Sequence, residues 1–254
     1  MKFYAGREVR LWGLEKREVS AHPSAPSVVA SGPFAGRKLD EVAPGFPILV
    51  KTIIAEDRLS VQVHPNERTA LLTGGEPKTE MWCILEPGPI YAGLKDGVGA
   101  DDVRRAVADG KFENLLVRHD AKRFECYYIP GGLVHAIGGG VKLFEVQQSS
   151  DTTYRLYDWG RVGADGAPRR LHIAEALASI DFSLQPPRPQ TAVDSPFFTF
   201  RQRDFDGEET VAAPEGEAIV VYAPETGDCE LLLPGESARP ARGRTFVVRA
   251  PYRA

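Results

Sequence analysis

The sequence predicts a mainly β protein in which short strands build a sandwich or barrel, with helices at the periphery and a smaller β part at the end. Runs rich in β-branched and apolar residues recur along the chain, and glycine and proline stand in the gaps between them. Two stretches break this pattern with helical spacing. A proline-rich segment comes late in the chain, and strand-like runs resume after it. These observations favour a β architecture over a parallel α/β sheet.

Strands dominate the first part of the chain, and helices interrupt them twice. One helix is expected over Asp101–Leu116, which opens with two aspartates and carries Val103, Ala106 and Val107 at helical spacing. The other is expected over Leu171–Ile180. The expected strands are Ile48–Ile54, Leu59–Val63, Met81–Leu85, Glu125–Ile129 and Val141–Val146.

Pro186–Pro189 predicts a linker, because successive prolines can neither continue a helix nor pair in a central strand. We therefore expect two domains, residues 1–185 and residues 190–254. The second has only about 65 residues, so the hypothesis is that it borrows strands from the N-terminus. Its expected strands are Phe197–Phe200, Ala218–Tyr222, Glu230–Leu233 and Thr245–Val248.

The composition excludes several classes of function. The 254 residues carry a formal net charge of −4, so no basic footprint indicates a nucleic-acid partner. No apolar run approaches the roughly 20 residues that span a membrane, and the N-terminus lacks the apolar core of a signal peptide. The 3 cysteines are an odd number without a CxxC pair, which argues against a disulfide framework and a thiolate zinc site. We expect a soluble cytoplasmic protein and leave its oligomeric state open.

Two of the five histidines stand in settings that favour a metal site. Gln62 and His64 are two positions apart on an expected strand, so their side chains share a face. Glu80 opens the next strand-like run, and a Pro-Gly-Gly turn delivers His135 at the head of another. Two imidazoles, a carboxylate and an amide oxygen suit Zn²⁺, with Mn²⁺, Co²⁺ or Fe²⁺ as alternatives. A single residue of this kind is more often a hydrogen-bonded core or surface residue than a metal ligand. The metal site is predicted because the settings of His64 and His135 occur together.

These segments resemble the metal motifs of the cupins, in which a strand pair ends in a glutamate and a Pro-x-Gly-x-x-His turn follows, here Pro130–His135. More specifically, the chain resembles the type I mannose-6-phosphate isomerases in their short bacterial and archaeal form. The similarity runs from Trp12 to about Ile180, and beyond the linker it is loose. The segments that carry it are Ser20–Pro23, Gly32–Gly36, Ser60–Pro65, Lys78–Trp82, Ile129–His135 and Glu145–Arg155.

The resemblance implies a cupin (jelly-roll) β-barrel with peripheral helices over residues 1–185, which binds the metal and carries the catalytic site. Residues 190–254 would form a smaller cupin-like β-domain without metal. The implied reaction is the metal-dependent interconversion of mannose 6-phosphate and fructose 6-phosphate through an enediolate. One Zn²⁺ per chain would be held by Gln62, His64, Glu80 and His135, with Arg155 as the active-site arginine and Lys78 lining the substrate site. The compact segment between His64 and Glu80 would reshape the rim of the pocket.

This reaction requires a group that moves a carbon-bound proton and a cation that opposes charge on oxygen. Glu145, Asp151 and Lys78 are candidates for the proton transfer, and Arg155 offers a planar cation for phosphate or enediolate. Glu145 could instead orient a metal ligand, Lys78 could be a solvated loop lysine, and Arg155 could form a structural salt bridge to Asp151 or Asp158. Candidates for binding sugar hydroxyls are Gln147, Gln148 and Asp151.

Two other readings stay open from the sequence. The first is another cupin enzyme, such as a metal-dependent dioxygenase or a phosphoglucose isomerase; a dioxygenase would give the block around Arg155 no evident purpose. The second is a non-catalytic, sugar-sensing cupin, which could keep the fold and lose ligands. Here Gln62, His64, Glu80 and His135 are all present, and we expect a small-molecule sugar phosphate as the partner.

Overall fold

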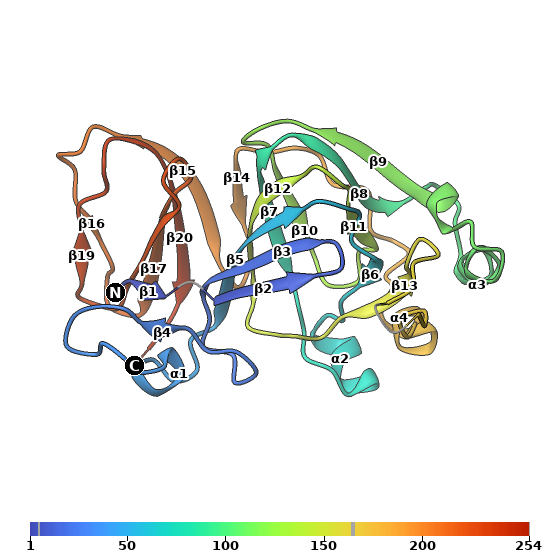
Figure 1. The fold of residues 1–254 in the computed structure, drawn as a ribbon, viewed down its shortest axis with the longest axis horizontal. Coiled ribbons are helices and arrows are strands. Elements are labelled where there is room, and N and C mark those ends of the chain that lie inside the picture. Colours follow the sequence, from blue (N-terminus) through green and yellow to red (C-terminus); the bar gives the residue numbers. More distant parts are fainter. Residues whose placement is uncertain (5, 164–165, 254) are drawn as a thin grey trace.

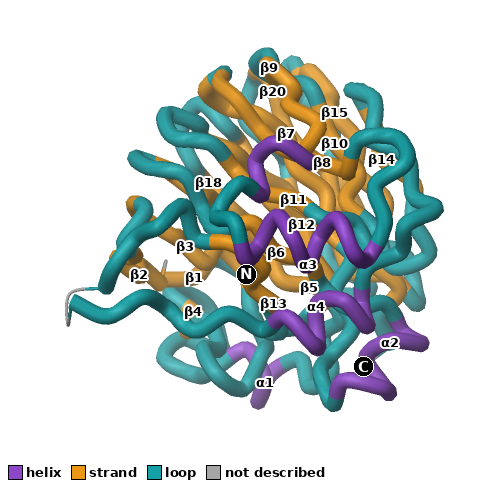
Figure 2. The backbone as a smooth tube through the Cα atoms, turned by 90° about the vertical axis from the view of Figure 1, so that its right-hand side faces the viewer, coloured by secondary structure: helices purple, strands orange, loops and turns teal. Residues whose placement is uncertain are grey.

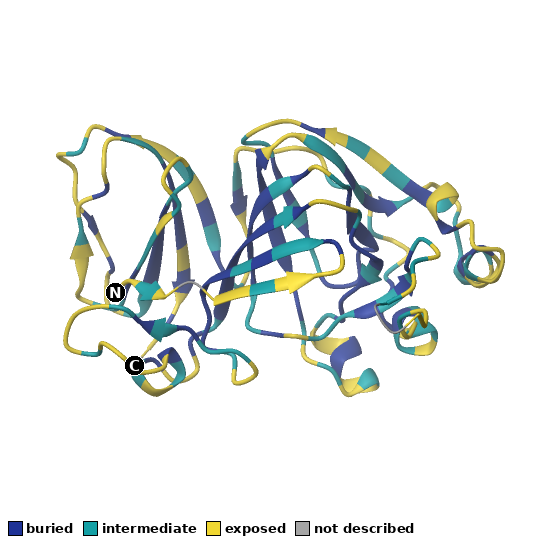
Figure 3. Ribbon diagram, viewed as in Figure 1, coloured by how far each residue is buried: buried dark blue, intermediate teal, exposed yellow. Residues whose placement is uncertain are grey.

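The computed structural model describes residues 1–4, 6–163 and 166–253, and it confirms the predicted mainly β fold. A barrel of two facing sheets occupies one end of the molecule, and the strands of the C-terminal segment occupy the other (Figure 1). Buried residues fill the interior of both ends, and exposed residues are concentrated in the loops, the helices and the edge strand β2 (Gly6–Arg10) (Figure 3).

The first barrel sheet has six antiparallel strands in the order β10-β7-β12-β5-β3-β2. One face of this sheet lines the barrel and the other packs against the C-terminal strands. Alternate residues of a strand therefore face two different buried environments. In β5, for example, Leu49, Lys51 and Ile53 alternate with Ile48 and Val50, which join the core shared with the C-terminal sheet. The strands other than β2 are β3 (Gly13–Val19), β5 (Ile48–Ala55), β7 (Glu80–Glu86), β10 (Cys126–Ile129) and β12 (Lys142–Gln148).

The second barrel sheet has five strands in the order β13-β6-β11-β8-β9. Its apolar residues Ile90 and Ile137 pack against Trp82 and Ile84 of the first sheet. These contacts form a buried core between the two sheets. Beside this core, the space between the two sheets contains a cavity lined mostly by polar side chains. The strands are β6 (Val61–Val63), β8 (Gly88–Leu94), β9 (Leu116–Ala121), β11 (His135–Ile137) and β13 (Tyr154–Tyr157).

The C-terminal strands form a five-stranded sheet in the order β14-β15-β20-β17-β18 and a two-stranded pair, β16-β19. Phe144 of β12 contacts Tyr222 and Phe246 of this sheet, with ring centroids 4.5 and 5.3 Å apart. The two ends of the molecule therefore share one apolar core. The strands are β14 (Ala192–Asp194), β15 (Thr199–Phe205), β16 (Val211–Ala212), β17 (Glu217–Ala223), β18 (Asp228–Leu232), β19 (Ser237–Ala238) and β20 (Gly243–Pro251).

The start of the chain lies against the C-terminal strands, but within the described ranges the five-stranded C-terminal sheet contains no N-terminal strand, so the expected borrowing of strands is not seen there. The backbone N–H of Leu231 donates to the carbonyl of Met1 at 2.8 Å. The adjoining strand β1 (Phe3–Tyr4) pairs with β4 (Val28–Val29), and Phe3 packs against the shared core.

The helices lie outside the sheets (Figure 2). They are α1 (Leu39–Val42), α2 (Glu67–Thr73), α3 (Ala100–Ala108) and α4 (Ile173–Ser179). The helix expected over Asp101–Leu116 is shorter than predicted: Gly110 adopts a φ of 64°, and a 3₁₀ turn over Phe112–Leu115 follows. Neither α1 nor α2 was predicted, although α2 has a capping box between Asn66 and Thr69. None of the helices in the described ranges has the length and hydropathy needed to cross a membrane.

Candidate metal centre and active-site cavity

The two barrel sheets bring the predicted ligand residues together. His135 of β11 is paired with Gln62 of β6, and Gln62 is paired with Arg155 of β13, so three polar side chains form a row across one sheet. His64 lies two residues beyond Gln62 and points to the same side. Glu80 begins β7 in the opposite sheet. The site thus lies between the sheets, with one acidic residue on one wall and the imidazoles on the other.

The donor atoms of His64, Glu80 and His135 all lie within 4.8 Å of one another, and all three residues are buried. His64 Nε2 is 3.2 Å from Glu80 Oε1, and His135 Nε2 is 3.7 Å from Glu80 Oε2. The side-chain amide of Gln62 is 3.4 Å from His135 Nε2. In the part of the chain that the structure describes, this is the one such group of three or more histidine, cysteine or acidic residues.

The hydrogen bonds of these residues fit a metal ion. His135 Nδ1 donates to the carbonyl of Leu133 at 2.9 Å, which leaves the lone pair of Nε2 directed at the cluster. His64 Nδ1 and Oε2 of Glu80 are buried without a hydrogen-bond partner, and His64 Nε2 faces Oε1 of Glu80. Buried polar atoms are rarely left unsatisfied, and a cation would satisfy those that face the cluster.

The charge states of the cluster fit the same interpretation. Burial lowers the pKa of His64 to about 3, and burial also lowers the pKa of His135, so both rings are neutral and can act as ligands. Burial raises the pKa of Glu80, but nearby Lys78 and His64 outweigh it and hold this pKa well below its ordinary value. Two neutral imidazoles and one carboxylate leave a bound divalent ion with net positive charge.

The Pro-Gly-Gly turn holds the two histidine segments against each other. The N–H of Gly132 donates to the carbonyl of His64 at 2.8 Å, and the N–H of Gly131 donates to Thr79 Oγ1 at 3.1 Å. A Cβ atom on Gly131 would lie 2.8 Å from the carbonyl oxygen of Pro65. The turn therefore requires glycine because the backbone beside His64 approaches it so closely.

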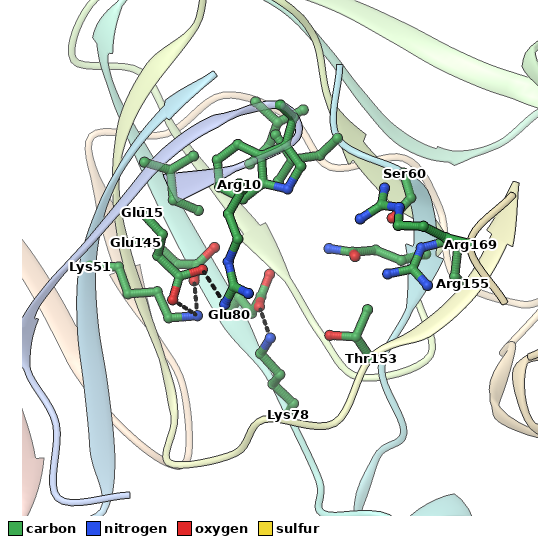
Figure 4. Close-up of a pocket in the computed structure, with 15 residues that line it drawn as sticks. Arg10, Glu15, Lys51, Ser60, Lys78, Glu80, Glu145, Thr153, Arg155 and Arg169 are labelled. Carbon is green, nitrogen blue, oxygen red and sulfur yellow. Dashed lines mark ion pairs between the residues drawn. The ribbon is translucent and has the colours of Figure 1, made fainter. Parts of the chain in front are cut away.

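A cavity of about 200 Å³ opens beside the cluster (Figure 4). The carboxylates of Glu15 and Glu145 lie on one side of it, together with Lys51, and the arginines Arg155 and Arg169 lie on the other. Its lining residues are Arg10, Trp12, Glu15, Lys51, Ile53, Leu59, Ser60, Gln62, Lys78, Glu80, Ile137, Glu145, Thr153, Arg155 and Arg169.

Glu145 is held at both carboxylate oxygens. Trp82 Nε1 donates to Oε2 at 3.1 Å, and Lys51 Nζ lies 3.5 Å from Oε1. Burial and the neighbouring Glu80 raise the pKa of Glu145 to about 7, although Lys51 and Lys78 oppose the shift. The predicted orientation of this residue toward the barrel agrees with its place in the cavity lining.

Among the described residues, the arginine side of the cavity carries more positive than negative charge. Asp158 binds Arg169 and Arg161, with Oδ1 2.6 Å from Nη2 of each. Arg155 makes no ion pair to Asp151 or Asp158; its Nη1 donates to the carbonyl of Arg170 at 2.9 Å. Its Nε is buried without a hydrogen-bond partner. Burial and the neighbouring Arg169 lower the pKa of Arg155. This side of the cavity can receive an anion.

Lys78 is buried, with Nζ 3.0 Å from Oε1 of Glu80, so it is no solvated loop lysine. Gln148 and Asp151, predicted to bind sugar hydroxyls, are absent from the cavity lining. The amide of Gln148 closes a loop by accepting from the N–H of Thr79 at 2.8 Å. Asp151 lies in a turn that folds back on β3 and contacts Ser24 and Arg17.

Lining residues that sequence reasoning missed include Glu15, Lys51 and Arg169. Lys51 had a usable signal, since it interrupts the apolar run from Ile48 to Ile54. A charged residue inside such a run indicates that one face of the strand serves something other than the core. Glu15 and Arg169 stand in polar segments that offered no such contrast.

The fold and the site define a cupin-type β-barrel whose inner face carries a metal-site-like cluster of histidine and glutamate. A scan against family models gives no match. The mannose-6-phosphate isomerase of Streptococcus mutans is 36% identical over 216 residues, which cover 74% of this chain and 68% of the relative. YvyI of Bacillus subtilis is 30% identical over 269 residues, which cover 91% of this chain and 84% of the relative.

A crystal structure of the mannose 6-phosphate isomerase from Bacillus subtilis superposes with a TM-score of 0.80 at 25% identity, covering 98% of both chains. A mannose 6-phosphate isomerase solved with zinc bound has a TM-score of 0.64 at 16% identity, which covers 100% of this chain and 99% of the other. The chain belongs to the mannose-6-phosphate isomerase family, as its sequence had indicated.

Proposed function

We propose that this protein is an aldose–ketose isomerase that interconverts mannose 6-phosphate and fructose 6-phosphate with the help of a bound metal ion. The observation that carries the proposal is the row Arg155, Gln62 and His135, which places a cation and two metal-ligand candidates side by side in one sheet. Arg155 and Gln62 of this row line the cavity. The named relatives support the choice of substrate. A dioxygenase would leave the arginine side of the cavity without a purpose.

The proposed ligands are His64, Glu80 and His135, with Gln62 as the fourth, and Zn²⁺ is the ion that this nitrogen and oxygen set suits best. When bound, the ion supplies positive charge that opposes negative charge developing on the sugar oxygens. Lys78 lies 3.0 Å from Glu80 and helps to keep that carboxylate ionised. Mn²⁺, Co²⁺ and Fe²⁺ remain alternatives to be tested.

The residues of the chain can perform the other steps. Glu145 is proposed to move the proton between C1 and C2, because it lines the cavity and both of its oxygens are held in place. Lys78 is the second candidate for this role. Arg155 and Arg169 are proposed to bind the phosphate, because their guanidinium groups lie on one side of the cavity. Among the residues that the structure describes, Asp158 is the acidic group recorded against them.

We also propose that the two domains expected from the sequence have different roles. Residues 1–185 contain the proposed ligands and lining residues, and residues 190–254 would form a smaller β-domain without a metal site. The C-terminal sheet covers the outer face of the first barrel sheet, so its proposed role is to support the wall that carries Glu145. A cytoplasmic location remains a prediction.

The experiment that tests the function combines metal analysis with a coupled assay on mannose 6-phosphate. The purified protein is expected to contain about one metal ion per chain, to lose activity on chelation, and to regain activity with Zn²⁺, Mn²⁺ or Co²⁺. Glucose 6-phosphate serves as the comparison substrate. A metal-loaded protein that binds mannose 6-phosphate without converting it would indicate a sugar sensor instead.

A further inference from the structure

Lys51 is an ammonium group buried between two carboxylates in the wall of the cavity. Its exposed fraction is 6%, and it stands in the middle of the apolar strand β5. Lys51 Nζ lies 3.5 Å from Glu145 Oε1 and 3.6 Å from Glu15 Oε1 (Figure 4). A buried cation is costly unless carboxylates compensate it, and here two of them do.

The pairing of the strands explains why these groups meet. Across the first barrel sheet, Trp82 is paired with Glu145, Glu145 with Lys51, and Lys51 with Arg17. Directly paired residues present their side chains to the same face, so the row faces the cavity. Glu15 joins the row through Arg17, whose Nε donates to Glu15 Oε1 at 3.0 Å. The row and Glu15 together contain two cations, Lys51 and Arg17, and two carboxylates, Glu145 and Glu15.

Within this row, Lys51 has a different task from its neighbours. Glu145 Oε2 is fixed by the Trp82 indole, but the ion pair recorded at Oε1 is with Lys51 alone among the described residues. Glu80 and Glu15 are the other carboxylates that act on Glu145, and both repel its negative charge. The removal of Lys51 would therefore free one oxygen of Glu145 and leave three acidic groups in one buried cavity.

We propose that Lys51 is a positioning residue for the isomerisation, which acts by holding Glu145 in the orientation needed for proton transfer. This inference rests on the proposed function of Glu145. It differs from a purely structural role, because its effect should pass through Glu145 and should appear in the chemical step rather than in metal binding or substrate affinity.

The test is a double-mutant cycle of Lys51→Met and Glu145→Gln in the full-length, metal-loaded protein. Lys51→Met is expected to lower kcat about 10²-fold with little change in KM and in metal content. In the Glu145→Gln background, the same substitution is expected to change kcat less than about twofold, because Lys51 then has no proton carrier to position.

Two further variants complete the design. Thr52→Val is the matched control, since Thr52 is the buried neighbour on the opposite face of β5 and hydrogen-bonds Glu18 outside the cavity at 2.8 Å. It is expected to lower the melting temperature and to keep the wild-type kcat. Lys51→Arg keeps the charge with a different geometry, so its kcat should fall about tenfold. If Lys51→Met does not fold, the kcat of Lys51→Arg is used to test the inference instead.

The outcomes separate this inference from the proposed function. A wild-type protein that is metal-loaded and inactive on mannose 6-phosphate contradicts the function itself. An active wild type whose Lys51→Met and Lys51→Arg variants keep full kcat contradicts the role of Lys51 alone. A Lys51→Met loss of equal size in the wild-type and Glu145→Gln backgrounds shows a structural contribution that bypasses Glu145, and it also overturns the inference.

Discussion

His135 donates one ring hydrogen to Leu133 and directs its other nitrogen at Glu80 and His64, so a single substitution should open the ligand set. His135→Ala is expected to lose bound metal and isomerase activity together. His119→Ala is the control, because His119 lies on β9 and contacts the carbonyl of Ala92 instead. Metal analysis after gel filtration distinguishes the two. Full metal occupancy in His135→Ala would contradict the proposed site.

The role of Arg155 can be distinguished from metal binding by mutation, because a guanidinium group has no free lone pair with which to bind a cation. Arg155→Ala should keep its metal and its melting temperature close to those of the wild type. If Arg155 stabilises charge that develops in the transition state, kcat should fall by roughly 10²–10³-fold, and a contact only with phosphate should raise KM instead. We expect both changes, with kcat the larger. Steady-state kinetics beside the exposed Arg118→Ala as control will show whether Arg155 acts in the cavity at all.

Asp158 links the stability of the arginine side to pH. Burial raises its pKa, but the hydrogen bonds from Arg169 and Arg161 outweigh this, so its pKa in the folded state is below the ordinary value. Its stabilising effect is therefore present above the unfolded-state pKa of about 3.9 and is lost as the pH falls through the folded-state pKa.

Asp158→Asn should accordingly lower the free energy of unfolding by about 1–3 kcal/mol at neutral pH. The difference from the wild type should shrink as the pH falls below about 4. Denaturant unfolding at several pH values measures it. An undiminished difference at the lowest pH where both proteins fold would show that the ion pairs are not its source.

The sequence was enough to predict which proposed ligand residues come together, but not all of the residues around them. Alternation on a strand predicted that Gln62 and His64 share a face, and the structure agrees. Glu15 and Arg169 line the same cavity through a strand pairing and a loop that no local pattern reveals. The placement of Asp151 depended on how a turn folds, and that turn packs on β3 rather than over the cavity.

At the scale of elements, the Pro-Gly-Gly turn fixes the distance between β6 and β11. Gly131→Ala should lower the free energy of unfolding by about 1–3 kcal/mol, because its Cβ would collide with the backbone of Pro65 and Asn66. The same collision should move His64 and weaken metal binding. Gly6→Ala is the control, since its Cβ would make an ordinary contact of 3.8 Å with Arg17. Thermal unfolding with and without chelator measures both effects, and equal metal affinity in the two variants would count against the turn's role.

Strand positions were easier to predict than helices for a physical reason. The strands of the barrel alternate between two buried faces, so their apolar runs stand out in the sequence. The helices α1 and α2 are short and lie on the surface, and their formation depends on caps and contacts more than on periodicity. The helix expected over Asp101–Leu116 ends before Gly110, which has a positive φ. A glycine just after the last helical residue is a C-cap signal, and it would have predicted the shorter helix.

At the scale of the whole molecule, the shared core couples the two ends. Phe246 lies in the C-terminal sheet and contacts Phe144 of the barrel with ring centroids 5.3 Å apart. Phe246→Ala should lower the free energy of unfolding by about 3–5 kcal/mol, and the protein should still unfold in one calorimetric transition. Two resolved transitions, with the upper one unchanged by the substitution, would show instead that residues 1–185 and 190–254 unfold independently.

The order of the strands has a consequence for synthesis on the ribosome. Gln62 and His135 are 73 residues apart, and β12, which lies between β7 and β5, follows both of them in the chain. The nascent chain therefore exposes Gln62, His64 and Glu80 well before β11 and β12, which complete the two sheets around them, have been translated. Because the Met1 carbonyl accepts a hydrogen bond from Leu231, this contact can form only after nearly the whole polypeptide has been synthesised. The proposed ligand set is therefore complete, and enclosed by both sheets, only after most of the polypeptide has been synthesised.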